Sequence, residues 1–120
     1  MTELSTLRQN AMTEREFQRQ VIQLAALRGW MVHHTRPARV RVKGKETYRT
    51  PVQGHKGFPD LVLARRGRVL MIELKASKGR LSAEQILWGR ALSGGVQPEE
   101  FSGWHVWRPY DWAEIERVLA

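Results

Sequence analysis

The sequence predicts a single α/β domain in which helices flank a mixed β-sheet. Its 120 residues are enough for one hydrophobic core but not for two. Segments with helical spacing of apolar residues alternate with short strand-like segments, in the order helix, strand, hairpin, helix, strand, helix. The chain contains no cysteine, which excludes a disulfide framework and any thiolate or cysteine–zinc chemistry.

The ends of the domain and its location follow from the same patterns. Residues 1–12 show no clear periodicity, so we expect a loose N-terminal arm followed by one domain over residues 13–120. No apolar run approaches the roughly 18 residues of a membrane span, and no signal-peptide core is present. We therefore expect a cytoplasmic protein that does not bind membranes.

The first helix is predicted to begin after Thr13. Thr13 and Glu16 fit a capping box, in which each side chain bonds the other residue's backbone N–H. Gly29 then ends the helix. The apolar stripe that faces the core consists of Phe17, Val21, Leu24 and Ala25.

A strand over residues 30–34 and a long basic segment over residues 35–57 come next. Val40 and Val42 alternate with basic residues, which predicts a short hairpin that turns at Lys43-Gly44. One face of this hairpin would be basic and could lie along phosphates. The alternative is a flexible surface loop.

A second hairpin is predicted to bring two carboxylates and an amine together. A turn at Arg66-Gly67 places Asp60 directly opposite Glu73. Because side chains alternate along a strand, Lys75 shares the face of Glu73. Two carboxylates can hold a divalent cation such as Mg²⁺, and a neighbouring lysine can orient or activate water, which indicates a phosphodiesterase site. The alternative is a solvated strand edge, where such residues are common.

The distribution of charge supports a polyanionic ligand. The net charge is +8, and residues 28–80 hold 14 Lys or Arg against three acids, a net +11. Two of those acids are the expected metal ligands. Nucleic-acid or anionic-surface binding alone would explain the basic block but not the position of the acids. The residues expected to contact nucleic acid are Arg36, Arg39, Arg41, Lys43, Lys45, Arg49, Lys56, Lys78 and Arg80.

The first helix offers a further carboxylate. At about 100° per residue, Glu14 and Gln18 fall on the flank of the apolar stripe, whereas Glu16 falls far from it. Glu16 is also occupied as a cap. Glu14 is therefore expected at the site, with Gln18 as a neutral neighbour in the same shell.

Two more helices are predicted in the C-terminal half. Ser82 caps one of them with Gln85 at the third position, and Gly94-Gly95 ends it. Its core-facing side is expected to be Ala83, Ile86, Leu87 and Arg90, with Trp88 flanking. A strand over residues 104–107 and a last helix from Asp111 follow. The inward-facing residues of the last helix are expected to be Trp112, Ile115, Val118 and Leu119.

Several short motifs follow one another in a specific order along nearly the whole chain after residue 12. They are Thr13-Glu14-x-x-Phe17-Gln18, Gly29-Trp30, Thr50-Pro51, Gly57-Phe58-Pro59-Asp60-Leu61, Glu73-Leu74-Lys75, Gly79-x-Leu81-Ser82-x-x-Gln85 and Val106-Trp107-Arg108-Pro109. In this order they resemble the phage-type VRR-NUC domain, a branch of the PD-(D/E)XK nuclease superfamily. The resemblance implies a restriction-endonuclease-like core and a metal-dependent DNA endonuclease.

The same resemblance implies a role for each site residue. Asp60, Glu73 and the main-chain carbonyl of Leu74 would bind Mg²⁺ or Mn²⁺. Lys75 would position or activate the attacking water and help to neutralise the phosphate. The products would carry 5′-phosphate and 3′-hydroxyl ends.

Two supporting residues and an assembly are implied as well. Glu14 would complete the acidic site, although several superfamily members carry this carboxylate where the present chain has Gln18. Gln85 matches a polar position near the substrate. Stand-alone domains of this kind resemble homodimeric endonucleases that cut four-way junctions. The alternatives are a nucleic-acid-binding module without catalysis and a nuclease subunit of a phage replication or packaging complex.

Overall fold

The structure is a computed structural model that describes residues 11–35, 38–42, 44–49, 54–94 and 103–120. The expected arm over residues 1–12 falls mostly outside these ranges, but Met12 packs against the core. None of the described helices is long and apolar enough to cross a membrane. The elements are α2 (Glu14–Leu27), β1 (Met31–His34), β2 (Ala38–Val42), β3 (Lys45–Arg49), β4 (Leu61–Arg65), β5 (Arg68–Leu74), α3 (Ala83–Ser93), β6 (Trp104–Trp107), a 3-10 turn (Pro109–Asp111) and α5 (Trp112–Leu119).

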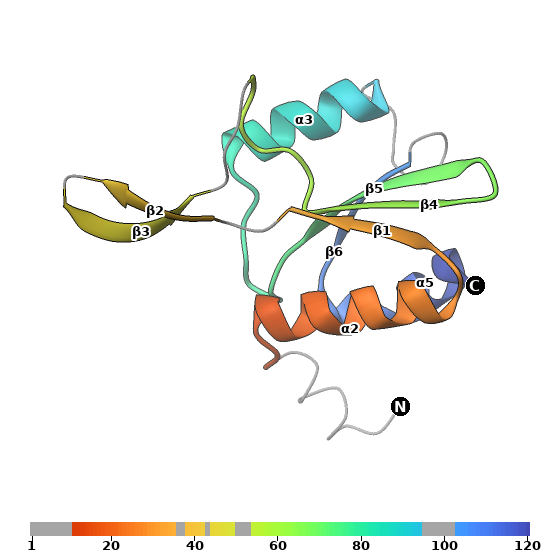
Figure 1. The fold of residues 1–120 in the computed structure, drawn as a ribbon. Coiled ribbons are helices and arrows are strands. Elements are labelled where there is room, and N and C mark those ends of the chain that lie inside the picture. Colours follow the sequence, from red (N-terminus) through yellow and green to blue (C-terminus); the bar gives the residue numbers. More distant parts are fainter. Residues whose placement is uncertain (1–10, 36–37, 43, 50–53, 95–102) are drawn as a thin grey trace.

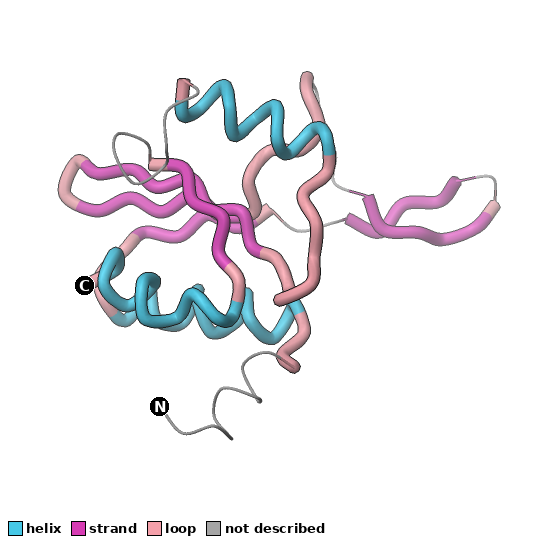
Figure 2. The backbone as a smooth tube through the Cα atoms, turned by 180° about the vertical axis from the view of Figure 1, so that it is seen from behind, coloured by secondary structure: helices cyan, strands magenta, loops and turns pink. Residues whose placement is uncertain are grey.

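Four strands form a mixed sheet in the order β1-β4-β5-β6. The pairs β1–β4 and β4–β5 are antiparallel, whereas β5 and β6 are parallel. Helices α2 and α5 cover one face of the sheet and α3 lies over the other (Figure 1), and the view from behind shows the same two layers (Figure 2). The predicted α/β class, a mixed sheet flanked by helices, is confirmed.

The core lies between the sheet and helices α2 and α5. The predicted cap of α2 is present, and its stripe is buried at Phe17, Val21 and Ala25. The predicted inward side of the last helix is also confirmed, because Ile115, Val118 and Leu119 are buried. The sheet supplies Leu61, Leu63, Leu70, Ile72, Leu74 and Trp107 to the same core.

Both predicted hairpins form with the expected turns. In the β4–β5 pair, Leu61 faces Ile72 and Arg65 faces Arg68, so Arg66-Gly67 is a two-residue turn. Strands β2 and β3 pair separately, with Val42 facing Lys45, and project from the body of the domain (Figure 1). The expected basic face of the β2–β3 hairpin concerns side chains that the structure does not describe.

Helix α3 faces the sheet with a different side from the one predicted. The residues expected to point inward, namely Ala83, Ile86, Leu87 and Arg90, are exposed. Gly89 is buried instead, and a Cβ at this position would overlap the Trp104 ring. Because glycine has no side chain, the helix can lie directly on the indole. The prediction was wrong because it weighted apolar residues and gave no weight to a glycine that permits close packing.

A set of hydrogen bonds ties the C-terminal residues to the sheet. Trp30 Nε1 donates to the Leu119 carbonyl at 3.1 Å. The Arg65 guanidinium lies 4.3 Å from the centre of the Trp30 ring and donates to the Arg28, Leu119 and Ala120 carbonyls. Arginine at these carbonyls satisfies acceptors that the ends of α2 and α5 leave without intrahelical partners.

The contact between α3 and Trp104 predicts an unusual response to Gly89→Ala. In an ordinary helix this change stabilises by about 1 kcal/mol. Here we expect a loss of about 1–3 kcal/mol, because the added methyl group must displace the indole. In a Trp104→Phe background, which removes the benzo ring, the same substitution should cost less. Urea unfolding of the four proteins tests this, and a stabilising Gly89→Ala in the wild-type background would contradict the packing.

Candidate active site

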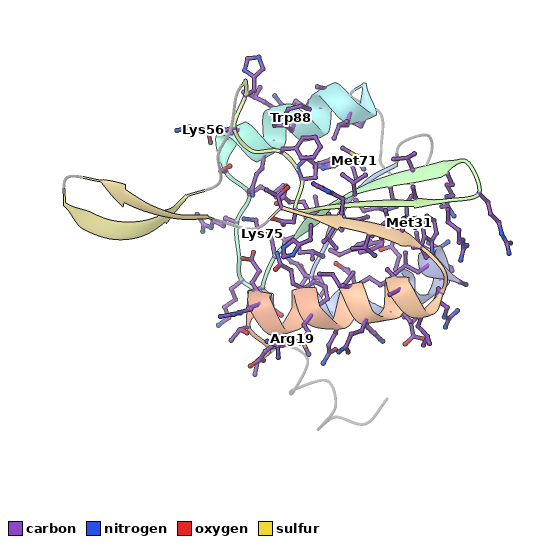
Figure 3. The ribbon with its side chains drawn as sticks, viewed as in Figure 1. Arg19, Met31, Lys56, Met71, Lys75 and Trp88 are labelled. Atoms are coloured by element: carbon purple, nitrogen blue, oxygen red, sulfur yellow. The ribbon has the colours of Figure 1, made fainter. Side chains whose placement is uncertain are left out.

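Asp60, Glu73 and Lys75 gather at one end of the sheet. Leu61 pairs with Ile72, so Asp60 and Glu73 are the next facing positions as β4 begins and β5 ends. Asp60 Oδ2 accepts a hydrogen bond from the Leu74 N–H at 2.8 Å. Lys75 follows directly on β5 (Figure 3), and its N–H donates to the Trp107 carbonyl at 3.0 Å. Backbone hydrogen bonds therefore fix the spacing of the three residues.

Glu73 is the centre of this group. Of the charged side chains that the structure describes, Glu73 alone is buried, with 1% of its surface exposed. Its Oε1 accepts a hydrogen bond from Gln85 Nε2 at 2.9 Å, whereas no donor of the described residues reaches the buried Oε2. An unpartnered buried carboxylate oxygen is costly, so Glu73 must either keep a proton or receive a cation.

The electrostatics agree with that conclusion. The pKa of Glu73 is raised from 4.5 to about 9. Burial is the largest cause, and a hydrogen bond with Asp60 and the negative charge of Asp60 add to it. The positive charge of Lys75 opposes this rise. Protonated Glu73 can thus share its hydrogen with Asp60, and loss of the proton leaves two carboxylates facing each other.

Helix α2 brings Glu14 to the same site. Burial and the charge of Asp60 raise the pKa of Glu14, and Lys75 lowers it, which places Glu14 within the electrostatic reach of both. Glu16 is occupied as predicted, because its Oε2 accepts from the Thr13 N–H at 3.3 Å. Gln18 lies one turn further along and is half-buried. The helix therefore presents Glu14 to the acidic pair.

Gln85 has two roles that the sequence suggested separately. As the third residue of α3, its Oε1 accepts from the Ser82 N–H at 2.8 Å, which completes the predicted capping box. The amide oxygen is thereby used at the cap, so the amide nitrogen points away and donates to Glu73. The helix cap and the orientation of the Glu73 carboxyl depend on one side chain.

The loop before Asp60 packs against α3. Gly57 has a φ of +91°, and a Cβ there would lie 2.6 Å from the backbone of Glu84. Phe58 meets Trp88 edge to face at 5.0 Å, and Trp88 Nε1 donates to the His55 carbonyl at 3.3 Å. The sequence did not predict this contact between Phe58 and Trp88. Gly57 was its one signal, because glycine marks a positive φ or a close backbone approach.

The predicted basic contacts surround the site only in part. Lys56, Lys78 and Arg80 are exposed, on the two loops that enter and leave the site. Arg108 donates to the Gly79 carbonyl at 2.9 Å and so anchors the second of these loops. Of the other predicted contacts, Arg36 and Lys43 lie outside the described residues, and the structure describes only the backbone of Arg39, Arg41, Lys45 and Arg49.

The donor atoms at the site fit a hard divalent cation such as Mg²⁺ or Mn²⁺. Within the described part of the chain, no three His, Asp or Glu residues cluster closely enough to hold a metal. A smaller set is present in Asp60, Glu73 and the Leu74 carbonyl. The Leu74 N–H points at Asp60, and the carbonyl of a strand residue lies on the same side as its N–H. These are all oxygen donors, as Mg²⁺ and Mn²⁺ prefer.

The raised pKa of Glu73 predicts that stability falls with rising pH. Between pH 4.5 and about pH 9 the folded protein holds a proton on Glu73 that the unfolded chain has lost. The free energy of unfolding therefore decreases as the pH rises through this window. Glu73→Gln removes the effect, so we expect this variant to gain on the wild type from about pH 5 to about pH 8. Urea unfolding of both proteins in EDTA tests this, and parallel pH curves would refute it.

Comparison with known proteins adds no second line of evidence. No protein-family model, no curated protein and no solved structure matches this chain. The site is therefore defined by its own geometry, which is a buried carboxyl, a facing carboxylate, an adjacent lysine and a helix cap that orients them.

Proposed function

We propose that this protein is a Mg²⁺- or Mn²⁺-dependent endonuclease that hydrolyses phosphodiester bonds in DNA. The observation that carries this proposal is the buried Glu73 carboxyl, whose Oε2 meets no donor among the described residues and whose neighbour is the carboxyl of Asp60. A carboxylate with a purely structural role is normally exposed or paired with a cation. No Lys or Arg of the described residues forms an ion pair with Glu73. A divalent cation would supply the missing charge.

Each residue at the site has a role in this chemistry. When bound, the metal would polarise the phosphate and lower the pKa of water. The Leu74 N–H holds Asp60, and Gln85 holds Glu73, so both carboxylates are oriented in advance. Lys75 would orient the attacking water and offset the charge of the phosphate. Water adds to phosphorus, the P–O3′ bond breaks, and the products carry a 5′-phosphate and a 3′-hydroxyl.

The proposed substrate is branched or duplex DNA. The basic block supports a polyanion whose backbone, rather than its bases, is contacted. The resemblance to phage-type VRR-NUC domains favours four-way junctions and a PD-(D/E)XK core. A homodimer would present two equivalent sites for two symmetric cuts, as a two-fold assembly does.

The second candidate is a nucleic-acid-binding module without catalysis. The separate β2–β3 hairpin in the middle of the basic block favours it, because a projecting basic ribbon can bind DNA without any chemistry. This candidate gives no reason for a buried carboxyl beside Asp60. A subunit of a larger nuclease complex would share the same site and differ only in requiring a partner for activity.

Cleavage assays test the catalytic assignment. We expect Asp60→Asn and Lys75→Met to lower the cleavage rate by roughly 100-fold or more, because each removes a group needed in the transition state. Binding of DNA in EDTA should be retained. Arg19→Gln, an exposed change on the outer side of α2 (Figure 3), serves as the control. The substrates are labelled junction, flap, duplex and single strand, with Mg²⁺, Mn²⁺ or EDTA.

Two outcomes would overturn the assignment. If both variants cut at the wild-type rate, these residues are not catalytic. If the wild-type protein binds DNA tightly but cuts none of the substrates with either metal, the binding module is the better description.

The assignment of Glu14 rather than Glu16 to the site can be tested with a matched pair of glutamine variants. Glu14→Gln should lower cleavage roughly 10- to 100-fold, as loss of an outer charge at a metal site does. Glu16→Gln should leave cleavage unchanged, since glutamine also closes a capping box. Rates under metal-saturating conditions, with unfolding curves for both variants, make the comparison. Equal rates in the two variants would remove Glu14 from the site.

A further inference from the structure

A second basic surface lies at the far end of the β4–β5 hairpin. A hollow of about 550 Å³ opens beside the Arg66-Gly67 turn. Residues from the end of α2, from β1 and from the hairpin line it, and none of the described lining residues is acidic. We call its four arginines, which are Arg28, Arg65, Arg66 and Arg68, the turn cluster.

No carboxylate of the described residues neutralises the turn cluster. Arg28, Arg66 and Arg68 are exposed, and within the described ranges no carboxylate lies at ion-pair distance from any of them. Arg65 differs, because backbone carbonyls hold its guanidinium against the Trp30 ring. The Arg68 guanidinium also lies over this ring, 5.9 Å from its centre. Protein surfaces normally mix the two signs, so a one-sided group of this kind suits an anionic ligand.

The backbone at Arg66 gives a second, independent reason. Arg66 has a φ of 51° and Gly67 a φ of 80°, the pattern of a type I′ turn. Asn, Asp or Gly is favoured at the first of these positions, and a long side chain there costs free energy. The turn would form more readily with another residue. An observed backbone outlier of this kind points to a function for its side chain.

The position of the turn cluster selects a long ligand. Arg68 begins β5 and Glu73 lies five residues further along it. At about 3.3 Å per residue the two are roughly 16 Å apart. Duplex DNA carries one charge per roughly 1.7 Å of axis when both strands are counted, which is about 3.4 Å per base pair. About five base pairs therefore cover this distance.

We propose that the turn cluster is a second phosphate-binding site, which holds the DNA backbone about five base pairs from the scissile bond. The proposal rests on the proposed function in taking DNA as the ligand. Met31 and Val69 give the hollow an apolar wall, against which sugars can pack. Arg28, Arg66 and Arg68 bind the phosphates, and Arg65, which backbone carbonyls hold in place, adds a fixed positive charge beside them.

The test removes three charges without disturbing the fold. The triple variant is Arg28→Gln, Arg66→Asn and Arg68→Gln, where asparagine suits a type I′ turn. The matched control is Arg15→Gln, Arg19→Gln and Arg117→Gln, three exposed arginines on helices α2 and α5. The probes are stem-loop DNAs with stems of about 3 and about 20 base pairs, the shorter of which spans only roughly 10 Å, bound in EDTA at several salt concentrations.

We expect the triple variant to bind the long stem at least ~10-fold more weakly than the control, with a salt slope smaller by about 2 to 3. Both variants should bind the short stem alike, because it cannot reach from the active site to the turn cluster. In Mg²⁺ the triple variant should show a raised KM for the long stem with an unchanged kcat. A loss confined to the long stem in a protein that cuts no DNA would support the turn cluster while overturning the proposed nuclease activity.

Two results would overturn the turn cluster itself. One is equal binding of the long stem by the triple variant and the control, in a protein that still cuts DNA. The other uses inorganic tripolyphosphate, added while the melting temperature is measured. If only the triple variant fails to respond to it and yet binds both stems normally, the ligand is a small polyphosphate and not DNA.

Discussion

The hydrogen bond from Gln85 to Glu73 is the contact on which the end of the sheet depends. It joins the first turn of α3 to the end of strand β5 and satisfies one of the two oxygens of a buried carboxyl. The loop before Asp60 packs on the same helix, so α3 also determines where the second carboxylate lies. A helix that makes few apolar contacts with the sheet is thus held by polar contacts and by two close approaches at glycine.

Much of this arrangement could be predicted from the sequence, because it follows from local rules. A two-residue turn at Arg66-Gly67 fixes which residues face each other, and this brought Asp60 to Glu73 without any tertiary information. Helical periodicity likewise separated Glu14 from Glu16, and the electrostatic coupling of Glu14 to Asp60 agrees with that separation. Capping boxes were found because their two residues are three apart in the chain.

Other features depend on contacts between distant residues and were not predictable in the same way. The orientation of α3 is set by Gly89 against Trp104, which an apolar count over the helix cannot detect. The wall formed by Phe58 and Trp88, and the bonds from Arg65 to the last carbonyls, join segments far apart in the sequence. Periodicity identifies which side of a helix is apolar, but a helix held by polar contacts need not bury that side.

The capping box of α3 has a consequence for how this site can be recognised in a sequence. At the third position of a helix, glutamate and glutamine close the box equally well. Here the side chain also faces a buried carboxyl, and a glutamate would add another carboxyl group where an amide donates a hydrogen bond. The helix alone accepts either residue, whereas the site accepts only the amide. A Ser-x-x-Gln cap after Glu-Leu-Lys is therefore a mark of the buried carboxyl as well as of the start of a helix.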